Sequence, residues 1–146
     1  KEVFHAFVVK NLFMTKQARP DTMTAVAFSC TGVKSPMQED WTKSVRLMKC
    51  LQGTKDMALT LSATRALCMK WFADAAFAVH PDMKSHTGHA MTVGRGCVTA
   101  NSSKQKLNTT SSTESESVCG DTTSKLLMWA KLHITALGHS PRMNVS

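Results

Sequence analysis

The sequence lacks several features that would assign it to a broad class of protein. It has no apolar stretch long enough to cross a bilayer, and its first residues lack the basic and then apolar pattern of a signal peptide. Its five cysteines are far apart and form no CxxC pair, which favours free thiols in a reducing compartment over a disulfide framework or a zinc knuckle. We therefore expect an intracellular protein with no membrane partner.

Acidic residues are also scarce. The chain has 10 Asp and Glu against 18 Lys and Arg, which gives a net charge of +8. This excess favours an anionic partner, and nucleic acid before a membrane surface, although many basic proteins bind no nucleic acid. Since 42% of the residues are hydrophobic, a packed core is expected. The chain begins with Lys rather than Met, so we expect it to be a piece of a longer polypeptide.

One of the few acids, Asp74, stands inside the apolar run of residues 71–79. A carboxylate in so apolar a strand should be buried, and burial without a partner is costly. About forty residues later, Ser111 and Glu114 form a capping-box signature at a helix start, and Glu116 follows. Two carboxylates that share cations can form a metal site that cleaves a nucleotidyl bond.

Helical geometry distinguishes Glu116 from the other acids of this helix. Residues three, four and seven positions apart share a face. The face of Glu116 is small and apolar and should lie against a sheet, because it holds Cys119, Gly120, Thr123, Leu127, Ala130 and Ile134. Glu116 is thus expected to point inward near Asp74, with Glu114 as a cap and Asp121 in a surface ion pair. The alternative is that Glu116 serves only the helix cap and dipole.

The spacing of apolar residues changes along the chain. Residues 1–56 are predicted to form three short helices. The third starts at Ser35-Pro36 and carries an apolar stripe of Met37, Trp41, Val45, Met48 and Leu51. In residues 57–146 the pattern predicts strands at 57–61, 66–79, 87–93 and from 97, then a helix that stops at Gly138. The last residues resemble the lead into another strand.

Five segments carry a resemblance to a known family. Residues 74–88 resemble the opening hairpin of the ribonuclease H domain in copia-type retrotransposon Pol polyproteins. Residues 104–116 are similar to that family's helix entry, a serine-rich cap followed by Glu-x-Glu. Upstream, Ala18-Arg19-Pro20-Asp21, Val33-Lys34-Ser35-Pro36 and residues 51–56 are similar to the end of the reverse transcriptase in the same polyprotein.

The resemblance implies two domains. Residues 1–56 would be the helical, thumb-like C-terminal part of the reverse transcriptase, and residues 57–146 the N-terminal part of a ribonuclease H-like domain. The implied fold class of the second domain is α/β. It would have a mixed sheet whose first three strands form an antiparallel meander, followed by a long helix.

The resemblance also implies an activity, the cleavage of RNA in RNA–DNA hybrids. By motif position, Asp74 and Glu116 would be catalytic and would hold two Mg²⁺ ions, one activating a water and the other stabilising the departing 3′ oxygen. Lys104 and Lys106 would contact the phosphates of the hybrid, the alternative being a solvated basic loop. The other implied partner is the rest of the polyprotein, in a cytoplasmic particle or in the nucleus.

The family places a third catalytic Asp on the strand after the long helix, and this sequence ends at Ser146, where that strand should begin. Asp121 is about 140° around the helix from Glu116 and Asp82 lies in a turn, so neither replaces it. We therefore expect an incomplete Mg²⁺ site and little or no activity in this fragment. The alternative is a non-catalytic nucleic-acid-binding remnant of a decayed element. The spacing of His86, His89 and Cys97 fits no standard zinc site.

Overall fold

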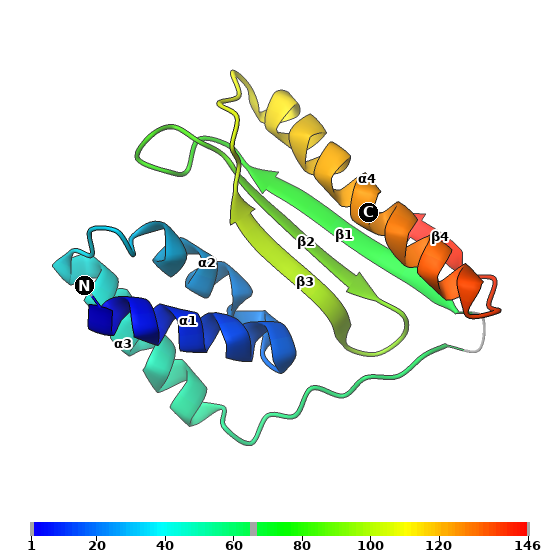
Figure 1. Cartoon of the computed structure of the whole chain (residues 1–146), viewed down its shortest axis with the longest axis horizontal. Helices are drawn as coiled ribbons and strands as arrows, with labels where there is room; N and C mark the ends of the chain where they lie inside the picture. The colour runs from blue at the N-terminus through cyan, green and yellow to red at the C-terminus, as the bar shows by residue number, and fades with distance from the viewer. Residues whose placement is uncertain (1, 65–66, 146) are drawn as a thin grey trace. The chain divides into compact units, whose positions relative to one another are not determined.

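The computed structural model describes residues 2–64 and 67–145. The chain divides into two compact units, Lys1–Leu59 and Thr60–Ser146, which we call unit 1 and unit 2 and describe separately (Figure 1). None of the helices in the described residues is long and apolar enough to cross a membrane.

Unit 1 is helical, and the prediction of three helices is confirmed. The described residues form α1 (Glu2–Gln17), the 3₁₀ turn η1 (Pro20–Thr22), α2 (Met23–Thr31) and α3 (Gln38–Gly53). Their core consists of Val26, Leu47 and Leu51, with Leu12, Met14 and Cys30 half-buried around it. The guanidinium of Arg19, which is almost completely buried, donates hydrogen bonds to the Asp21 carboxylate and to Thr54 and so ties the turn after α1 to the end of α3.

The start of α3 differs from the prediction. The helix begins at Gln38 with Met37 as N-cap, and the Met37 backbone N–H donates to the carboxylate of Asp40 at 2.9 Å. The expected cap at Ser35 is therefore wrong. An acid at the third helical position accepts the free N–H of the cap residue, and this fixes the helix start two residues further along the chain than Pro36 suggested.

The predicted apolar stripe of α3 is also wrong. The buried residues are Ser44, Leu47 and Leu51, because this is the face that packs on Val26 of α2. Of the five predicted members only Leu51 is buried. Trp41 is half-buried, and its ring packs edge-on against that of Phe4 with 5.1 Å between the ring centroids. The other three, Met37, Val45 and Met48, are exposed.

Unit 2 is an α/β unit with a mixed four-stranded sheet of order β3-β2-β1-β4 in its described residues. The strands β1 (Cys68–Ala76), β2 (His86–Thr92) and β3 (Cys97–Lys104) form an antiparallel meander. The long helix α4 (Ser112–Ala136) follows, and β4 (Arg142–Val145) then pairs with β1 in parallel (Figure 1). The predicted α/β class, the meander, the long helix and its stop at Gly138 are confirmed.

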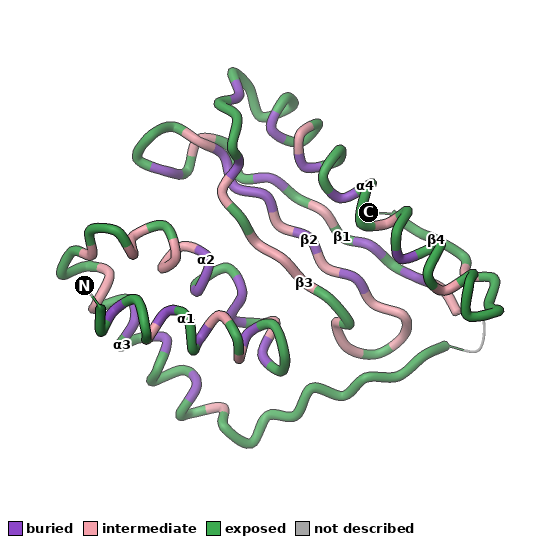
Figure 2. The backbone as a smooth tube through the Cα atoms, in the orientation of Figure 1, coloured by how far each residue is buried: buried purple, intermediate pink, exposed green. Residues whose placement is uncertain are grey.

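The core of unit 2 lies between the sheet and α4. Buried and exposed positions alternate along β1 and β2, as Figure 2 shows. The buried side chains Met69, Trp71 and Met91 of the sheet pack against Ala130 of α4, with Val93, Leu127 and Ile134 around them. The strand predicted at 66–79 is shorter than expected. Residue 66 lies outside the described residues, and β1 ends at Ala76, just before Ala78 adopts a left-handed φ of 52°.

The strand predicted at 57–61 is absent from the structure, where residues 57–64 are extended without regular pairing. Two backbone N–H groups of this segment, from Ser62 and Thr64, donate to carbonyls at the β2–β3 turn. A Cβ at Gly94 or Gly96 would collide with backbone oxygens of Ser62 or Thr60, so the glycines of this turn permit the close approach.

Candidate metal and nucleic-acid site

Asp74 lies near the C-terminal end of β1, opposite Gly88 of β2, which in turn pairs with Ser102 of β3. Its side chain is exposed, so the prediction of a buried carboxylate is wrong. Alternation along β1 places it on the sheet face opposite the one that α4 covers, because Trp71 and Ala75 are buried. Apolar residues do occupy the open side of the strand, and Phe72 for example is 47% exposed. The apolar run therefore did not indicate burial on both faces.

Glu116 lies in the first turns of α4 and is exposed too. The buried stripe of α4 contains Ser115, Cys119, Thr123 and Ala130, with Leu127 and Ile134 half-buried. Five of the six residues predicted for this face are thus correct, and Gly120 is exposed. The stripe starts at Ser115, four positions before Cys119, so Glu116 stands beside it and the expected inward orientation is wrong.

The start of α4 is fixed by its cap. The Ser111 hydroxyl accepts a hydrogen bond from the Glu114 N–H at 3.1 Å, as a capping box requires. The Glu114 carboxylate, however, accepts from the N–H and the hydroxyl of Thr110, at 2.6 and 2.8 Å, one residue earlier than in a capping box. These bonds lower the pKa of Glu114. Glu114 is thus engaged in capping, while Asp121 pairs with Lys125 at 2.7 Å, both as predicted.

A contact between helix and strand places the two candidate acids at one end of unit 2. The Cys119 thiol donates to the backbone carbonyl of Asp74 at 3.3 Å, and this helical turn comes directly after Glu116. Figure 1 shows the start of α4 beside the end of β1. In residues 2–64 and 67–145, no hydrogen bond joins the Asp74 and Glu116 carboxylates, and the Asp74 Oδ1 accepts from the Ala75 N–H at 2.9 Å.

The surroundings of Asp74 suit a hydrated hard cation. Carboxylate oxygens are the donors that Mg²⁺ takes, and this ion usually retains several waters. A Cβ built on Gly88, directly across from Asp74, would meet none of the described atoms within 4 Å, so there is space for such waters. Among the described residues, no group of three or more His, Cys, Asp or Glu side chains is placed to hold a metal.

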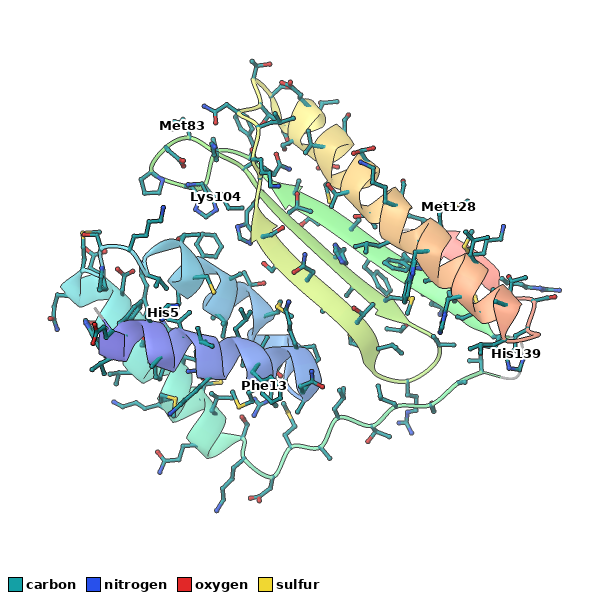
Figure 3. All side chains as sticks on the ribbon, viewed as in Figure 1. His5, Phe13, Met83, Lys104, Met128 and His139 are labelled. Carbon is teal, nitrogen blue, oxygen red and sulfur yellow. The ribbon has the colours of Figure 1, made fainter. Side chains whose placement is uncertain are left out.

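Lysines gather where the β1–β2 loop meets the residues after β3. Lys104 forms an ion pair with Asp82 at 2.6 Å, and this hydrogen bond lowers the pKa of the Asp82 carboxyl. Lys106 is exposed, and its carbonyl accepts a hydrogen bond from the Lys84 ammonium at 2.9 Å. Lys104 and Met83 mark this end of the sheet in Figure 3. Lys84 was not identified from the sequence, where nothing distinguishes it from other surface lysines.

A buried histidine pair lies at the same end of the sheet. His80 Nε2 and His86 Nδ1 are 2.9 Å apart, and His86 Nε2 is 2.6 Å from the Ser102 hydroxyl. Burial lowers the pKa of both rings, and neighbouring Lys104 adds to the effect on His80. Strand alternation places His89 on the other face of the sheet from His86. His89 therefore faces α4, and its ring centroid lies 6.2 Å from that of Trp71.

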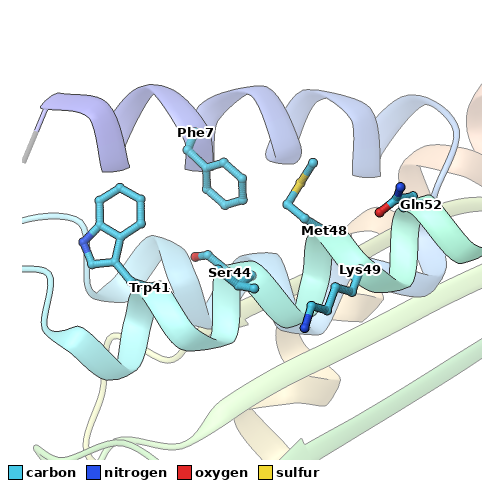
Figure 4. Close-up of a pocket in the computed structure, with 7 residues that line it drawn as sticks. Phe7, Trp41, Ser44, Met48, Lys49 and Gln52 are labelled. Atoms are coloured by element: carbon cyan, nitrogen blue, oxygen red, sulfur yellow. The ribbon is translucent and has the colours of Figure 1, made fainter.

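Unit 1 carries a separate hollow. A groove of about 410 Å³ lies between α1 and α3 (Figure 4). Its lining consists of Phe7, Trp41, Ser44, Val45, Met48, Lys49 and Gln52. The lining is mainly apolar and holds no acid, so this groove offers no site for a metal ion.

Comparison with known proteins relates the chain to mobile elements. No protein-family model matches it, and no solved structure matches it. It is 30% identical over 121 residues, 82% of its length, to the retrovirus-related Pol polyprotein from transposon TNT 1-94 of Nicotiana tabacum. It is also 30% identical over 132 residues, 90% of its length, to the retrovirus-related Pol polyprotein from transposon RE2 of Arabidopsis thaliana. The chain spans about 9% of the length of each relative, so most of it is similar to a short segment of retrotransposon Pol polyproteins.

Proposed function

We propose that this chain is a segment of a retrotransposon Pol polyprotein in which the end of the reverse transcriptase precedes the first part of a ribonuclease H domain. In the parent protein, unit 2 would then take part in cleaving the RNA strand of RNA–DNA hybrids. The observation that carries the proposal is the contact between the Cys119 thiol and the Asp74 carbonyl, which holds the helical turn after Glu116 against the strand of Asp74. The similarity to Pol polyproteins over most of the chain supports it.

The order of elements in unit 2 supports the same proposal. The resemblance implies a mixed sheet that starts with an antiparallel three-stranded meander, then a long helix and a further strand, and unit 2 has its elements in this order. Its last strand pairs with β1 in parallel. The helical unit 1 takes the position expected for the end of a reverse transcriptase.

The carboxylates of Asp74 and Glu116 would act as ligands for Mg²⁺. Bound Mg²⁺ would supply an activated water and stabilise the charge that develops on the leaving 3′ oxygen. The remaining ligands would come from acids elsewhere in the parent polyprotein. The described residues of this chain contain no group of three side chains that could hold a metal. Lys84, Lys104 and Lys106 would bind phosphates near this site, which positions the hybrid without reading its sequence.

A second candidate is a nucleic-acid-binding module without catalysis. The absence of a third metal-binding side chain beside Asp74 and Glu116 among the described residues favours it. This candidate predicts binding of hybrid that is lost at high salt and is not strengthened by divalent cations.

Titration with Mn²⁺, a paramagnetic substitute for Mg²⁺, tests the proposed site in the full chain. We expect selective broadening of the amide NMR signals of residues 73–75 and 115–117. The broadening should disappear in Asp74→Asn and persist in Asp121→Asn, whose carboxylate is already paired with Lys125 on the same helix.

Two results would contradict the metal site. One is broadening that centres on another acid, such as Asp82, and the other is broadening that Asp74→Asn leaves unchanged. Hybrid binding that Mn²⁺ does not strengthen, together with no selective broadening, would support the non-catalytic module.

A further inference from the structure

A buried glutamine connects the sheet to the first turns of α4. Gln105 directly follows β3 and is only 6% exposed. Its backbone N–H donates to the Ser85 carbonyl at 2.9 Å. Its side-chain amide nitrogen donates two further bonds of 2.9 Å, to the Thr87 hydroxyl of β2 and to the Ser115 carbonyl of α4. One side chain thus spans from a strand to a helix.

The two ends of this bridge lie next to the proposed metal site. Thr87 precedes Gly88, which is paired with Asp74 across the sheet. Ser115 precedes Glu116 and is itself completely buried. The bridge therefore joins the strand that neighbours Asp74 to the turn that carries Glu116, and it limits how far that turn can move from the sheet.

The hydrogen bonds of the bridge determine the orientation of the amide. The Ser115 carbonyl can only accept, so the amide nitrogen must face it. The amide oxygen, Oε1, is then buried without a partner among the described residues. An unpaired buried acceptor lowers stability. A methionine, which is similar in size, would remove this unpaired acceptor together with both hydrogen bonds that the amide nitrogen donates.

We propose that Gln105 is a positioning residue, whose amide fixes the first turns of α4 and thereby the place of Glu116 relative to Asp74. This inference rests on the proposed function, because the site that Gln105 positions is the proposed Mg²⁺ site. Outer residues that orient metal ligands commonly change metal affinity by about 10- to 100-fold when they are replaced.

The test compares Gln105→Met with Ser85→Ala in the full chain. Ser85 is completely buried and belongs to the same polar region, but its hydroxyl contacts the Ala78 N–H and Thr109, both outside α4. Three quantities are measured for each variant: the urea midpoint, the exchange rate of the amides of residues 112–117 without metal, and the Mn²⁺ concentration for half-maximal broadening.

For Gln105→Met we expect a lower urea midpoint than in the wild type, because two buried hydrogen bonds are lost. We also expect faster exchange at the start of α4 and an Mn²⁺ requirement raised about tenfold. For Ser85→Ala we expect a lower midpoint, with exchange in 112–117 and Mn²⁺ affinity close to wild type. A purely structural glutamine predicts the same lower midpoint for Gln105→Met, but no selective change in exchange at residues 112–117 or in Mn²⁺ affinity.

The exchange measurement separates this inference from the proposed function. If the wild type shows no selective broadening by Mn²⁺, the proposed metal site fails, and exchange alone decides the role of Gln105. Faster exchange confined to residues 112–117 in Gln105→Met then supports its positioning role, and unchanged exchange overturns it.

Discussion

Three of the residues with buried polar side chains in unit 2 are histidines. His80 and His86 are hydrogen-bonded to each other at the end of the sheet, and His89 packs near Trp71 beneath α4. Burial lowers the pKa of all three below their ordinary value of 6.5, and the charge of Lys104 acts in the same direction on His80 while Asp82 opposes it. All three rings are therefore neutral in the folded protein near neutral pH.

These shifts predict a loss of stability in mild acid. Because folding lowers each pKa, the unfolded chain binds more protons than the folded chain between the folded-state pKa values and 6.5. Stability should be complete above about pH 7 and should fall as the pH drops through 6.5. Urea unfolding between pH 7.5 and about 5 measures this, and His89→Phe should reduce the slope. Stability that rises on acidification, or a slope unchanged in His89→Phe, would show that burial of His89 does not have this effect.

At the scale of elements, the turn between β2 and β3 depends on glycine. Gly96 has a left-handed φ of 78°, and a Cβ there would collide with the Thr60 carbonyl oxygen of the extended segment before β1. Gly120, in contrast, lies on the exposed side of α4, where a Cβ would meet none of the described atoms within 4 Å.

These two glycines should respond in opposite ways to the same substitution. Gly96→Ala should lower the free energy of unfolding by about 1–3 kcal/mol, through backbone strain and loss of the packed segment. Gly120→Ala should raise it by up to about 1 kcal/mol, because alanine favours the helix. Chemical denaturation measures both. Equal effects of the two substitutions would contradict the close approach of the extended segment to the turn.

Periodicity in the sequence was sufficient to predict where most helices and strands lie. It was a poorer guide to which side of each helix or strand is buried. The small face of α4 was predictable because most other residues in the first half of the helix, around Cys119 and Thr123, are Ser, Thr, Asp or Glu. In α3, several faces carry large apolar residues, and packing on Val26 selects the one with Leu47 over the one with Met48. Asp74 was misjudged because an apolar run does not reveal that only one face of the sheet is covered.

The candidate site was predictable only in part for a related reason. Motif position selected Asp74 and Glu116 as candidates, whereas the bridge through Gln105 depends on three segments that are distant in sequence. Hydrogen bonds across such distances leave no periodic pattern. The pairing of His80 with His86 was missed for the same reason, since the β1–β2 loop brings them together.

At the scale of the whole molecule, the excess of positive charge is shared by both units. Each unit carries nine Lys or Arg and five Asp or Glu, so the net charge of +8 is divided equally between them. Each unit by itself therefore carries an excess of positive charge, which favours an anionic partner. The similarity to Pol polyproteins also extends over both units, as expected for one continuous segment of a longer protein.

We propose above all that the carboxylates of Asp74 and Glu116 are ligands of one Mg²⁺ site. A crystal structure of the chain soaked with Mn²⁺ tests it most directly, because anomalous scattering locates the ion without ambiguity. A shared site predicts a peak about 2.1 Å from carboxylate oxygens of both residues, or a pair of peaks about 4 Å apart with one residue at each. Carboxylates more than about 8 Å apart, too far to share a metal pair, with Mn²⁺ on other acids, would contradict it.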